Sequence, residues 1–290
     1  MISEGKRLLG AHMSISDGIS KSIDRGLSIG CTAIQIFTGY NNRWVSKPLQ
    51  NKDLRDFHQK RSLLGIILTH NNYLINLASI DPVKSIKSFN SMLDEIERAE
   101  KLKLPFLVIH PGSHLGNGEK RGVQLIAERL NKLFSETKDS TVRILLENTA
   151  GQGTNLGYSF EHLAEIFSMV KDQERIGVCF DTCHAFAAGY DLRNREAYER
   201  TFESFSGIIG LCHLYAFHLN DSKTGLGSRR DRHEHIGKGF LGLEAFRLLL
   251  NDERFVHLPM ILETPKGKAM DEDKKNMDVL HSLIKNGVHF

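Results

Sequence analysis

Short apolar runs recur along the chain, and most of them end in a residue that can bind a metal ion. Four such runs, residues 106–110, 143–147, 177–181 and 260–263, end in His110, Glu147, Asp181 and Glu263. Four further runs have the same character and cover residues 8–12, 33–37, 65–70 and 214–218. Buried runs of this length are typical of parallel strands that are covered on both faces. The pattern therefore predicts eight parallel strands.

Segments with helical periodicity alternate with these runs, at residues 17–29, 51–64, 82–104, 119–138, 159–171, 195–209, 243–250 and 271–285. Asp81 followed by Pro82 is a typical start of a helix. Eight alternating strands and helices predict an α/β fold, a (β/α)8 TIM barrel, for which about 250 residues are usual. We expect one domain over residues 1–290, with the Gly- and Asn-rich segment 148–158 as a loop.

In a TIM barrel, side chains at the carboxyl ends of the strands line one pocket. The candidate ligands at this face are His70, His110, Glu147, Asp181, His184, His218, Asp231, His233 and Glu263. Because one zinc ion takes only about four ligands, nine are too many for a single ion. Three zinc ions with bridging carboxylates also balance the four acidic residues and leave positive charge for an anion. We therefore predict a trinuclear zinc site at the C-terminal face of the strands.

Two pairs of candidates are close in sequence. Asp231 and His233 point the same way in an extended segment, so both can bind one ion, and His235 is predicted to support them from one step further along. Asp181 and His184 form a similar pair across a strand end and the following turn. Cys179 and Cys183 are an alternative zinc pair, but their spacing is wider than usual in zinc sites.

Composition and charge add limits to this picture. The net charge is +3, and no apolar run approaches the roughly 20 residues that span a bilayer. The N-terminal residues lack the apolar stretch of a signal peptide, and the four cysteines suit buried, reduced positions, so we predict a cytoplasmic protein. Nine basic residues fall in loops that follow strands and form a predicted track for a phosphate backbone: Arg43, Lys47, Lys223, Arg229, Arg230, Arg232, Lys238, Lys266 and Lys268.

Several segments together resemble the endonuclease IV family of apurinic/apyrimidinic (AP) endonucleases. They are residues 10–14, 70–77, 177–191, 218–223, 231–237 and 261–265. The resemblance implies a (β/α)8 barrel with three zinc ions. It assigns His70, His110 and Glu147 to the first ion, Glu147, Asp181, His218 and Glu263 to the second, and His184, Asp231 and His233 to the third.

The resemblance also implies the reaction. It predicts hydrolysis of the DNA phosphodiester 5′ to an abasic site, which leaves a 3′-hydroxyl, and removal of blocking groups from 3′ ends. Glu147, Asp181 and Glu263 are the carboxylates on which catalysis is expected to depend, with Glu147 as the bridge between ions. The expected partner is duplex DNA with abasic sites or blocked 3′ ends, bound by a monomer.

Other residues are expected to contact DNA. The resemblance places Tyr73 and Leu74 against the base stack beside the lesion, where an abasic site lacks the stacking that resists flipping. The family usually carries an arginine two positions before Trp44, but this chain has Asn42 there and Arg43 beside it. The residue that enters the minor groove is therefore open between Asn42 and Arg43.

Two other functions fit part of the pattern. Metal-dependent sugar isomerases and epimerases use the same barrel with one or two ions, and they have little need of Asp231 and His233. A non-catalytic binder of DNA lesions would keep the metal as a structural part and bind DNA through the basic loops. Counting metal ions separates the first alternative, and a DNA-nicking assay separates the second.

Overall fold

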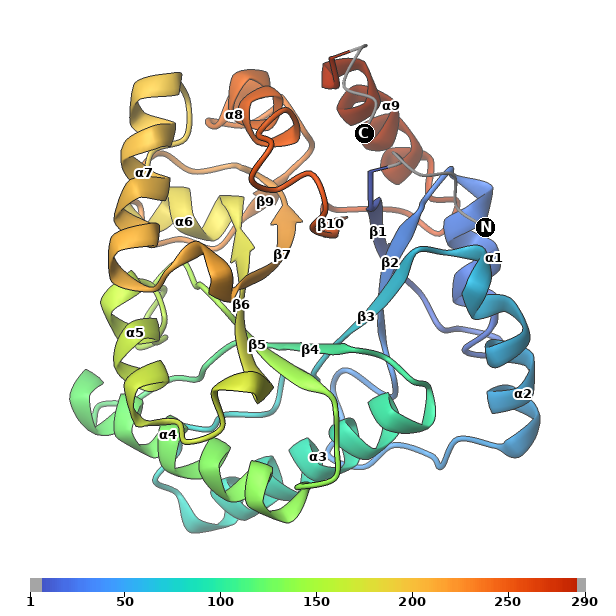
Figure 1. The fold of residues 1–290 in the computed structure, drawn as a ribbon, viewed down its shortest axis with the longest axis vertical. Helices are drawn as coiled ribbons and strands as arrows, with labels where there is room; N and C mark the ends of the chain where they lie inside the picture. Colours follow the sequence, from blue (N-terminus) through green and yellow to red (C-terminus); the bar gives the residue numbers. More distant parts are fainter. Residues whose placement is uncertain (1–6, 286–290) are drawn as a thin grey trace.

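Eight parallel strands form a closed barrel in the computed structural model, which describes residues 7–285. They are β1 (Leu9–Met13), β2 (Ala33–Phe37), β3 (Ile66–His70), β4 (Phe106–Ile109), β5 (Arg143–Glu147), β6 (Ile176–Asp181), β7 (Leu214–Leu219) and β10 (Met260–Leu262). Their order around the barrel is β1-β10-β7-β6-β5-β4-β3-β2, and all pairs are parallel (Figure 1). The (β/α)8 prediction is confirmed.

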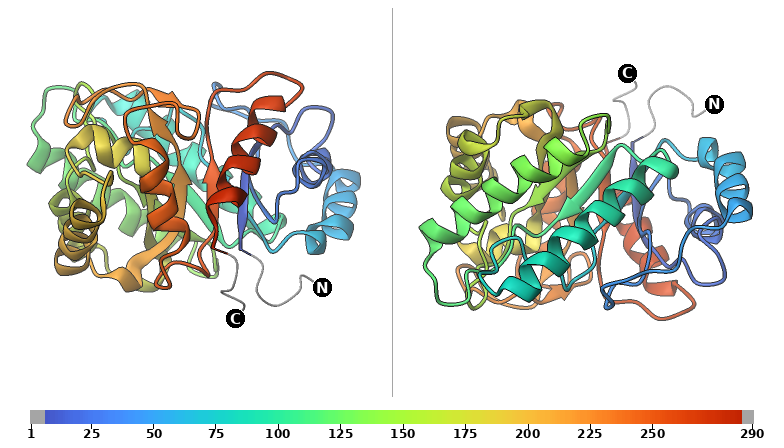
Figure 2. Two further views of the ribbon diagram at one scale, coloured as in Figure 1. Left: turned by 90° about the horizontal axis from the view of Figure 1, so that it is seen from above. Right: turned by 90° about the horizontal axis from the view of Figure 1, so that it is seen from below.

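Helices surround the strands. They are α1 (Lys21–Ser28), α2 (Asn51–Lys60), α3 (Pro82–Lys101), α4 (Glu119–Glu136), α5 (Phe160–Met169), α6 (Thr182–Ala188), α7 (Arg195–Ile208), α8 (Gly242–Leu250) and α9 (Asp271–Leu283). Short 3-10 turns cover Arg61–Leu63, Gln173–Arg175 and Leu211–His213. Helices α3 and α4 lie side by side against one side of the barrel (Figures 1 and 2). Within the described residues, no helix is both long and apolar enough to cross a membrane.

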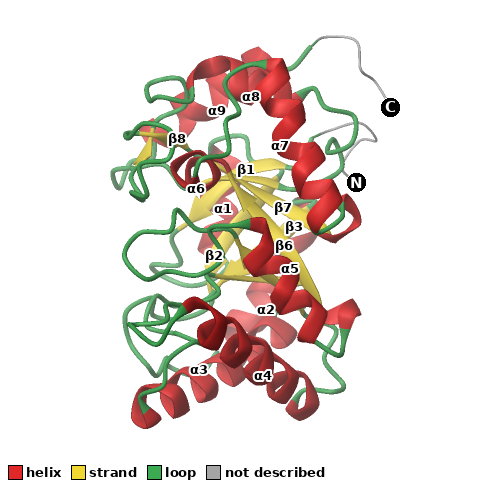
Figure 3. Ribbon diagram, turned by 90° about the vertical axis from the view of Figure 1, so that its left-hand side faces the viewer, coloured by secondary structure: helices red, strands yellow, loops and turns green. Residues whose placement is uncertain are grey.

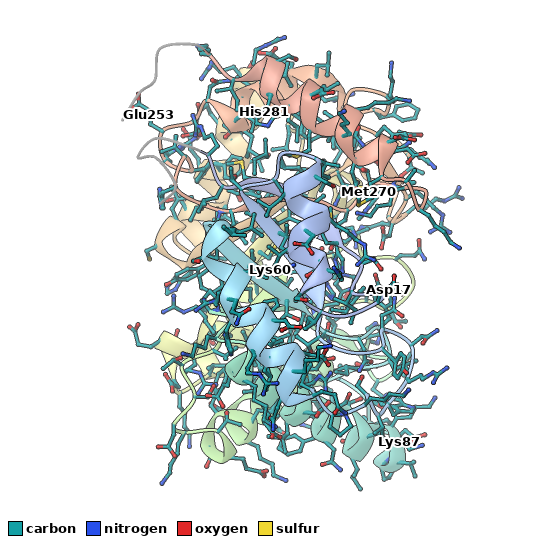
Figure 4. All side chains as sticks on the ribbon, turned by 90° about the vertical axis from the view of Figure 1, so that its right-hand side faces the viewer. Asp17, Lys60, Lys87, Glu253, Met270 and His281 are labelled. Atoms are coloured by element: carbon teal, nitrogen blue, oxygen red, sulfur yellow. The ribbon has the colours of Figure 1, made fainter. Side chains whose placement is uncertain are left out.

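Three predicted helix ends differ from the structure by three residues or more. The helix expected to reach residue 64 ends at Lys60 and continues as a 3-10 turn, and the backbone explains the other two. The first helix begins at Lys21 rather than residue 17, because Asp17 and Gly18 have φ of 64° and 118°, outside the helical region. Helix α2 lies beside α1 (Figure 4), and Lys60 at the end of α2 forms an ion pair of 2.6 Å with Asp24 of α1. At the other end of the third helix, Lys103 has φ of 55°, so α3 stops before residue 104.

Two further elements were not predicted. Helix α6 follows β6 directly, because the Asp181 side chain accepts a hydrogen bond from the His184 amide and caps the helix. The antiparallel pair β8 (Asp221–Ser222) and β9 (His233–Glu234) lies between β7 and β10. Both elements lie among the loops that follow the strands, which gather on the side of β8 in Figure 3.

The core has two apolar layers separated by the strands. Ile34 and Ile36 of β2 belong to the large layer between strands and helices, whereas Ala33 belongs to the small layer inside the barrel. The inner layer consists of Ala33, Leu68, Val108, Leu145, Cys179, Ala216 and Ile261. Towards the carboxyl ends of the strands the interior becomes polar, and the candidate site lies there.

Candidate metal centre

The nine candidate ligands lie together at the carboxyl ends of the strands. Within each of three groups, the potential ligand atoms are all within 4.8 Å of one another. The groups are His70, His110 and Glu147; Glu147, Asp181, His218 and Glu263; and His184, Asp231 and His233. Strands β3, β5, β6, β7 and β10 supply or immediately precede the first two groups, with His110 following β4. The third group comes from α6 and from the segment that leads into β9.

Glu147 lies between the first two groups and is fully buried. Its Oε2 is 3.2 Å from the Nε2 atoms of both His70 and His110, while its Oε1 is 3.0 Å from Nδ1 of His218. Burial alone would raise the pKa of this carboxyl, but the imidazoles of His218 and His110 hold it well below its usual range. The two oxygens of one carboxylate therefore face two different groups, which is the geometry of a bridging ligand.

Three imidazoles are oriented by backbone carbonyls. Nδ1 of His70 is 2.8 Å from the Asn71 oxygen, Nδ1 of His184 is 3.0 Å from the Asn148 oxygen, and Nδ1 of His233 is 3.1 Å from the Glu263 oxygen. A carbonyl oxygen only accepts hydrogen bonds, so each of these Nδ1 atoms donates. In the neutral imidazoles, the lone pairs of all three Nε2 atoms therefore point into the site.

These Nε2 atoms face other electron-rich atoms. Nε2 of His184 is 3.2 Å from Oδ1 of Asp231 and 3.4 Å from Nε2 of His233. Lone pairs at such distances repel one another unless a proton or a cation lies between them. Imidazole nitrogens whose other ring N–H is held by a carbonyl are the usual form of histidine metal ligands. The donor set therefore fits divalent cations of the zinc type.

The electrostatics of the side chains agree with this picture. Burial lowers the pKa of His184, but the carboxylates of Asp181, Asp231 and Glu147 outweigh burial and raise it well above its usual range. Without a cation, protons on the imidazoles balance the buried carboxylates. Binding of divalent ions would replace those protons.

Each oxygen of the Asp181 carboxylate accepts a hydrogen bond, one in the helix cap and one from Asn220. Asp181 is fully buried, its Oδ1 accepts from the His184 amide at 2.7 Å, and its Oδ2 accepts from Nδ2 of Asn220 at 2.6 Å. Asn220 in turn accepts from the backbone N–H of Glu263 at 2.9 Å. One buried asparagine thus fixes two of the four residues in the second group.

Asp231 and His110 have the most exposed side chains of the nine candidates, at 38% and 35%, while His233 is 17% exposed. The segment before β9 is tied to the loop after β5, because Gln152 Oε1 accepts from the Asp231 amide at 3.1 Å. The Arg229 guanidinium also lies 3.8 Å from the centre of the Tyr158 ring.

The cysteine alternative receives little support. Cys183 lies near Asp181 and His233, but burial raises the pKa of its thiol to about 12. Burial also raises the pKa of Cys179 to about 12, and this side chain packs in the layer inside the barrel. Both cysteines are free and buried, and a thiol is a much poorer metal ligand than a thiolate.

The predicted DNA contacts lie on loops at the same face. Tyr73 is 65% exposed, its ring packs edge-on against Phe37, and its backbone N–H donates to the Asn41 oxygen at 3.0 Å. Leu74 is half-buried. Asn42 and Arg43 are exposed, and the Arg43 guanidinium lies 4.5 Å from the centre of the Tyr40 ring. Arg230 and Arg232 are exposed as well.

The predicted basic track is less uniform than the sequence indicates. Lys266 pairs with the buried Asp273 at 2.7 Å, and Lys223 lies 4.0 Å from Glu234. The stacked Arg229 also has a partner within the protein. The remaining basic residues, Arg43, Lys47, Arg230, Arg232, Lys238 and Lys268, are all exposed.

The predicted supporting role of His235 is wrong, and three residues that do hydrogen bond to the site were not predicted. His235 hydrogen bonds to Asn276 of α9 at 3.2 Å, because the chain turns towards α9 after β9. Gln35, Asn148 and Asn220 are buried and hydrogen bonded to members of the site. The only sequence signal for Gln35 was a polar residue inside an apolar run.

Comparison with known proteins gives consistent matches over nearly the whole chain. A family model described as a xylose isomerase-like TIM barrel matches residues 23–283. A probable endonuclease 4 of Chloroflexus aggregans is 50% identical over 278 residues, covering 95% of this chain and 97% of that protein. A probable endonuclease 4 of Citrifermentans bemidjiense is 49% identical over 279 residues, or 96% and 99% of the two chains.

Solved structures agree with these matches. The crystal structure of endonuclease IV from Thermus thermophilus aligns with a TM-score of 0.83 and 33% identity, covering 96% of this chain and 98% of that chain. A D-tagatose 3-epimerase-like protein aligns with a TM-score of 0.71 at 22% identity, covering 94% and 96%. The second likeness shows a shared fold alone.

Proposed function

Because the chain belongs to the endonuclease IV family of xylose isomerase-like TIM barrels, we propose that it is a zinc-dependent DNA-repair endonuclease. Its substrate is duplex DNA that contains abasic sites. It hydrolyses the phosphodiester 5′ to the abasic site and leaves a 3′-hydroxyl. It also removes blocking groups from damaged 3′ ends.

One observation supports the metal assignment most strongly. The Nε2 atoms of His70, His184 and His233 face carboxylate oxygens or each other, while their Nδ1 atoms are held by carbonyls. We assign the three groups to three zinc ions, with Glu147 shared by the first two. When bound, the ions supply a nucleophile at neutral pH and neutralise charge on the phosphodiester oxygens.

The residues of the chain have separate tasks in this scheme. Glu147 sets the spacing between two ion positions, because its two oxygens diverge towards different groups. Asp181 and Glu263 complete the second group and limit its net charge. His184, Asp231 and His233 would hold the third ion beside this pair, and its positive charge would stabilise the departing 3′ oxygen.

The loops at this face are assigned to DNA binding. Tyr73 and Leu74 are proposed to contact the bases beside the lesion, since the Tyr73 ring is exposed while its backbone is fixed to Asn41. Arg230 and Arg232 flank Asp231 and are proposed to neutralise phosphates near the third group. Asn42 and Arg43 remain the two candidates for the minor groove.

The sugar epimerase alternative is less favoured. Such an enzyme has no evident use for the group of His184, Asp231 and His233, which this structure assembles at ligand distance. A lesion binder without catalysis would not need three converging groups of ligands. We also propose that the protein acts as one domain, as a monomer, and in the cytoplasm.

The proposal is tested with a labelled duplex that carries one synthetic abasic site. We expect a single cut 5′ to the lesion, an end that a polymerase extends, and no cut in the same duplex without the lesion. A second substrate with a 3′-phosphate tests end cleaning. Glu147→Gln serves as the matched control, because it keeps the shape and removes the charge. Binding without any cut, at full metal occupancy, would support the lesion binder instead.

A further inference from the structure

A buried glutamine lies beside the second group of ligands. Gln35 is the central residue of β2, is fully buried, and pairs in register with His12 of β1 and Leu68 of β3. Its neighbours along the strand, Ile34 and Ile36, face the helices. A primary amide inside a barrel is costly unless its hydrogen bonds are satisfied.

The amide group of Gln35 contacts two candidate ligands at once. Its Nε2 donates to Oε1 of Glu263 at 2.5 Å, and its Oε1 is 2.9 Å from Nε2 of His218. Its Nε2 is also 3.0 Å from Nδ1 of His12. The amide orientation is fixed by chemistry, because an ionised carboxylate only accepts hydrogen bonds and the nitrogen must face Glu263.

Each of these two hydrogen bonds determines which atom of His218 or Glu263 remains available to a metal ion. The Gln35 oxygen only accepts, so Nε2 of His218 donates to it and the lone pair is on Nδ1. That Nδ1 lies 3.0 Å from Oε1 of Glu147 and 3.3 Å from Oε2 of Glu263. On Glu263, the glutamine occupies Oε1 and leaves Oε2 facing the same point.

We propose that Gln35 is a positioning residue that fixes the His218 tautomer and the Glu263 carboxylate for the second metal ion. The inference rests on the proposed function and deepens it. Within the described residues, no hydrogen bond of Gln35 reaches His184, Asp231 or His233, the third group. Loss of Gln35 therefore acts on one part of the centre rather than on all of it.

Two substitutions test different parts of the contact. Gln35→Leu keeps most of the volume but removes the acceptor of the His218 N–H, and it leaves Oε1 of Glu263 with only Nδ1 of His12, 3.5 Å away. Gln35→Glu keeps the shape but places a carboxylate against Oε1 of Glu263, which repels it. The matched control is Ile36→Val, because Ile36 is buried in the same strand and packs on the opposite side of the sheet.

The measurement is zinc binding to metal-free protein in competition with a chromophoric chelator. Absorption spectra of the cobalt-loaded protein report the ligand geometry. We expect one of three zinc equivalents to bind about 10-fold to 100-fold more weakly in both Gln35 variants, as for other residues that orient metal ligands. The cobalt spectrum should change, and kcat should fall with KM nearly constant. Ile36→Val should bind all equivalents like the wild type.

Several outcomes overturn the inference. Wild-type affinities and an unchanged cobalt spectrum in both Gln35 variants contradict it, as does an equal loss in Ile36→Val. If Gln35→Leu fails to fold, Gln35→Glu decides alone. A wild-type protein that binds three zinc ions but does not cut abasic DNA refutes the proposed function, while the zinc titrations still decide the role of Gln35. A wild-type protein that binds no zinc refutes both.

Discussion

The centre has two parts that are supported in different ways. The barrel-borne part consists of His70, His110, Glu147, Asp181, His218 and Glu263, and the loop-borne part consists of His184, Asp231 and His233. Exposure does not separate the two parts: in the barrel-borne part Glu147 and His218 are completely buried while His110 is 35% exposed. In the loop-borne part His184 is 2% and Asp231 38% exposed.

The two parts differ in the contacts that fix the backbone of their ligand residues. A strand-borne ligand is held on both sides by the ladder of a closed barrel, so its position is set by the fold. Asp231 instead precedes a two-residue strand and is tied to the rest by Gln152 and by Arg229 on Tyr158. Rigid elements place ligands more precisely than loops do. We therefore expect the ion held by His184, Asp231 and His233 to be the easiest to remove.

The largest effect is expected for the residue that joins the first two groups. Glu147→Ala removes a carboxylate shared by two groups, so nicking should fall by about a thousandfold or more. Metal analysis should show loss of more than one ion. Binding to duplex DNA should be nearly retained, because the exposed arginines are unchanged. Glu263→Ala should lower nicking to a similar extent but affect the second ion alone, because Glu263 belongs to one group. Activity within tenfold of wild type for both variants would refute the assignment.

A smaller and more local effect is expected in the loop-borne part. Asp231→Ala should remove one ion and lower nicking by about a hundredfold, while two ions stay bound. Elemental analysis after gel filtration measures the count. Loss of all three ions would contradict this and show that the two parts do not bind their ions independently.

A weaker effect is expected from the hydrogen bond that joins Gln152, in the loop after β5, to the backbone N–H of Asp231. Gln152→Ala removes the acceptor for the Asp231 amide, without touching a ligand side chain. Affinity for one zinc ion should fall by about tenfold, and a chelator should extract that ion first. Asn131→Ala removes a side-chain hydrogen bond to the Met169 oxygen, outside the site, and is the control. An unchanged order of extraction would argue that the loop is fixed by other contacts.

The smallest effect concerns a loop that carries no ligand. Arg43 is exposed and stacked on Tyr40, so Arg43→Ala should weaken binding to abasic duplex by about fivefold. If Arg43 enters the minor groove, binding to intact duplex changes less, because a side chain inserted as a wedge acts only where the DNA helix is opened. Lys47→Ala is the control for a general phosphate contact. Equal losses on both duplexes at matched salt rule out the wedge role.

The sequence predicts the strands and the placement of the barrel-borne residues well, for a physical reason. Apolar runs that end in His, Asp or Glu specify both a buried strand and the face at which it ends, so the eight strands and the candidate ligands at their ends are predicted together. Helix α6 and the β8–β9 pair were not predicted. They depend on a side-chain cap at Asp181 and on short pairing between segments far apart in sequence.

The supporting residues illustrate the same limit. Gln35 forms its contacts with residues about two hundred positions away, and no local pattern encodes such a distance. His235 shares the parity of Asp231 and His233, but the chain turns after Glu234 and directs it to Asn276. Periodicity predicts which side of a strand a residue occupies, and it fails where the strand ends.

The number of metal ions can be measured with a crystal structure of the protein purified with zinc, with anomalous diffraction recorded on both sides of the zinc absorption edge. We expect three anomalous peaks, one within each group of ligands, with the two barrel-borne peaks joined by Glu147. The peak beside Asp231 should have the lowest occupancy after brief treatment with a chelator. A single peak, or two peaks with none between His184 and His233, would contradict the trinuclear centre and favour an epimerase-like site.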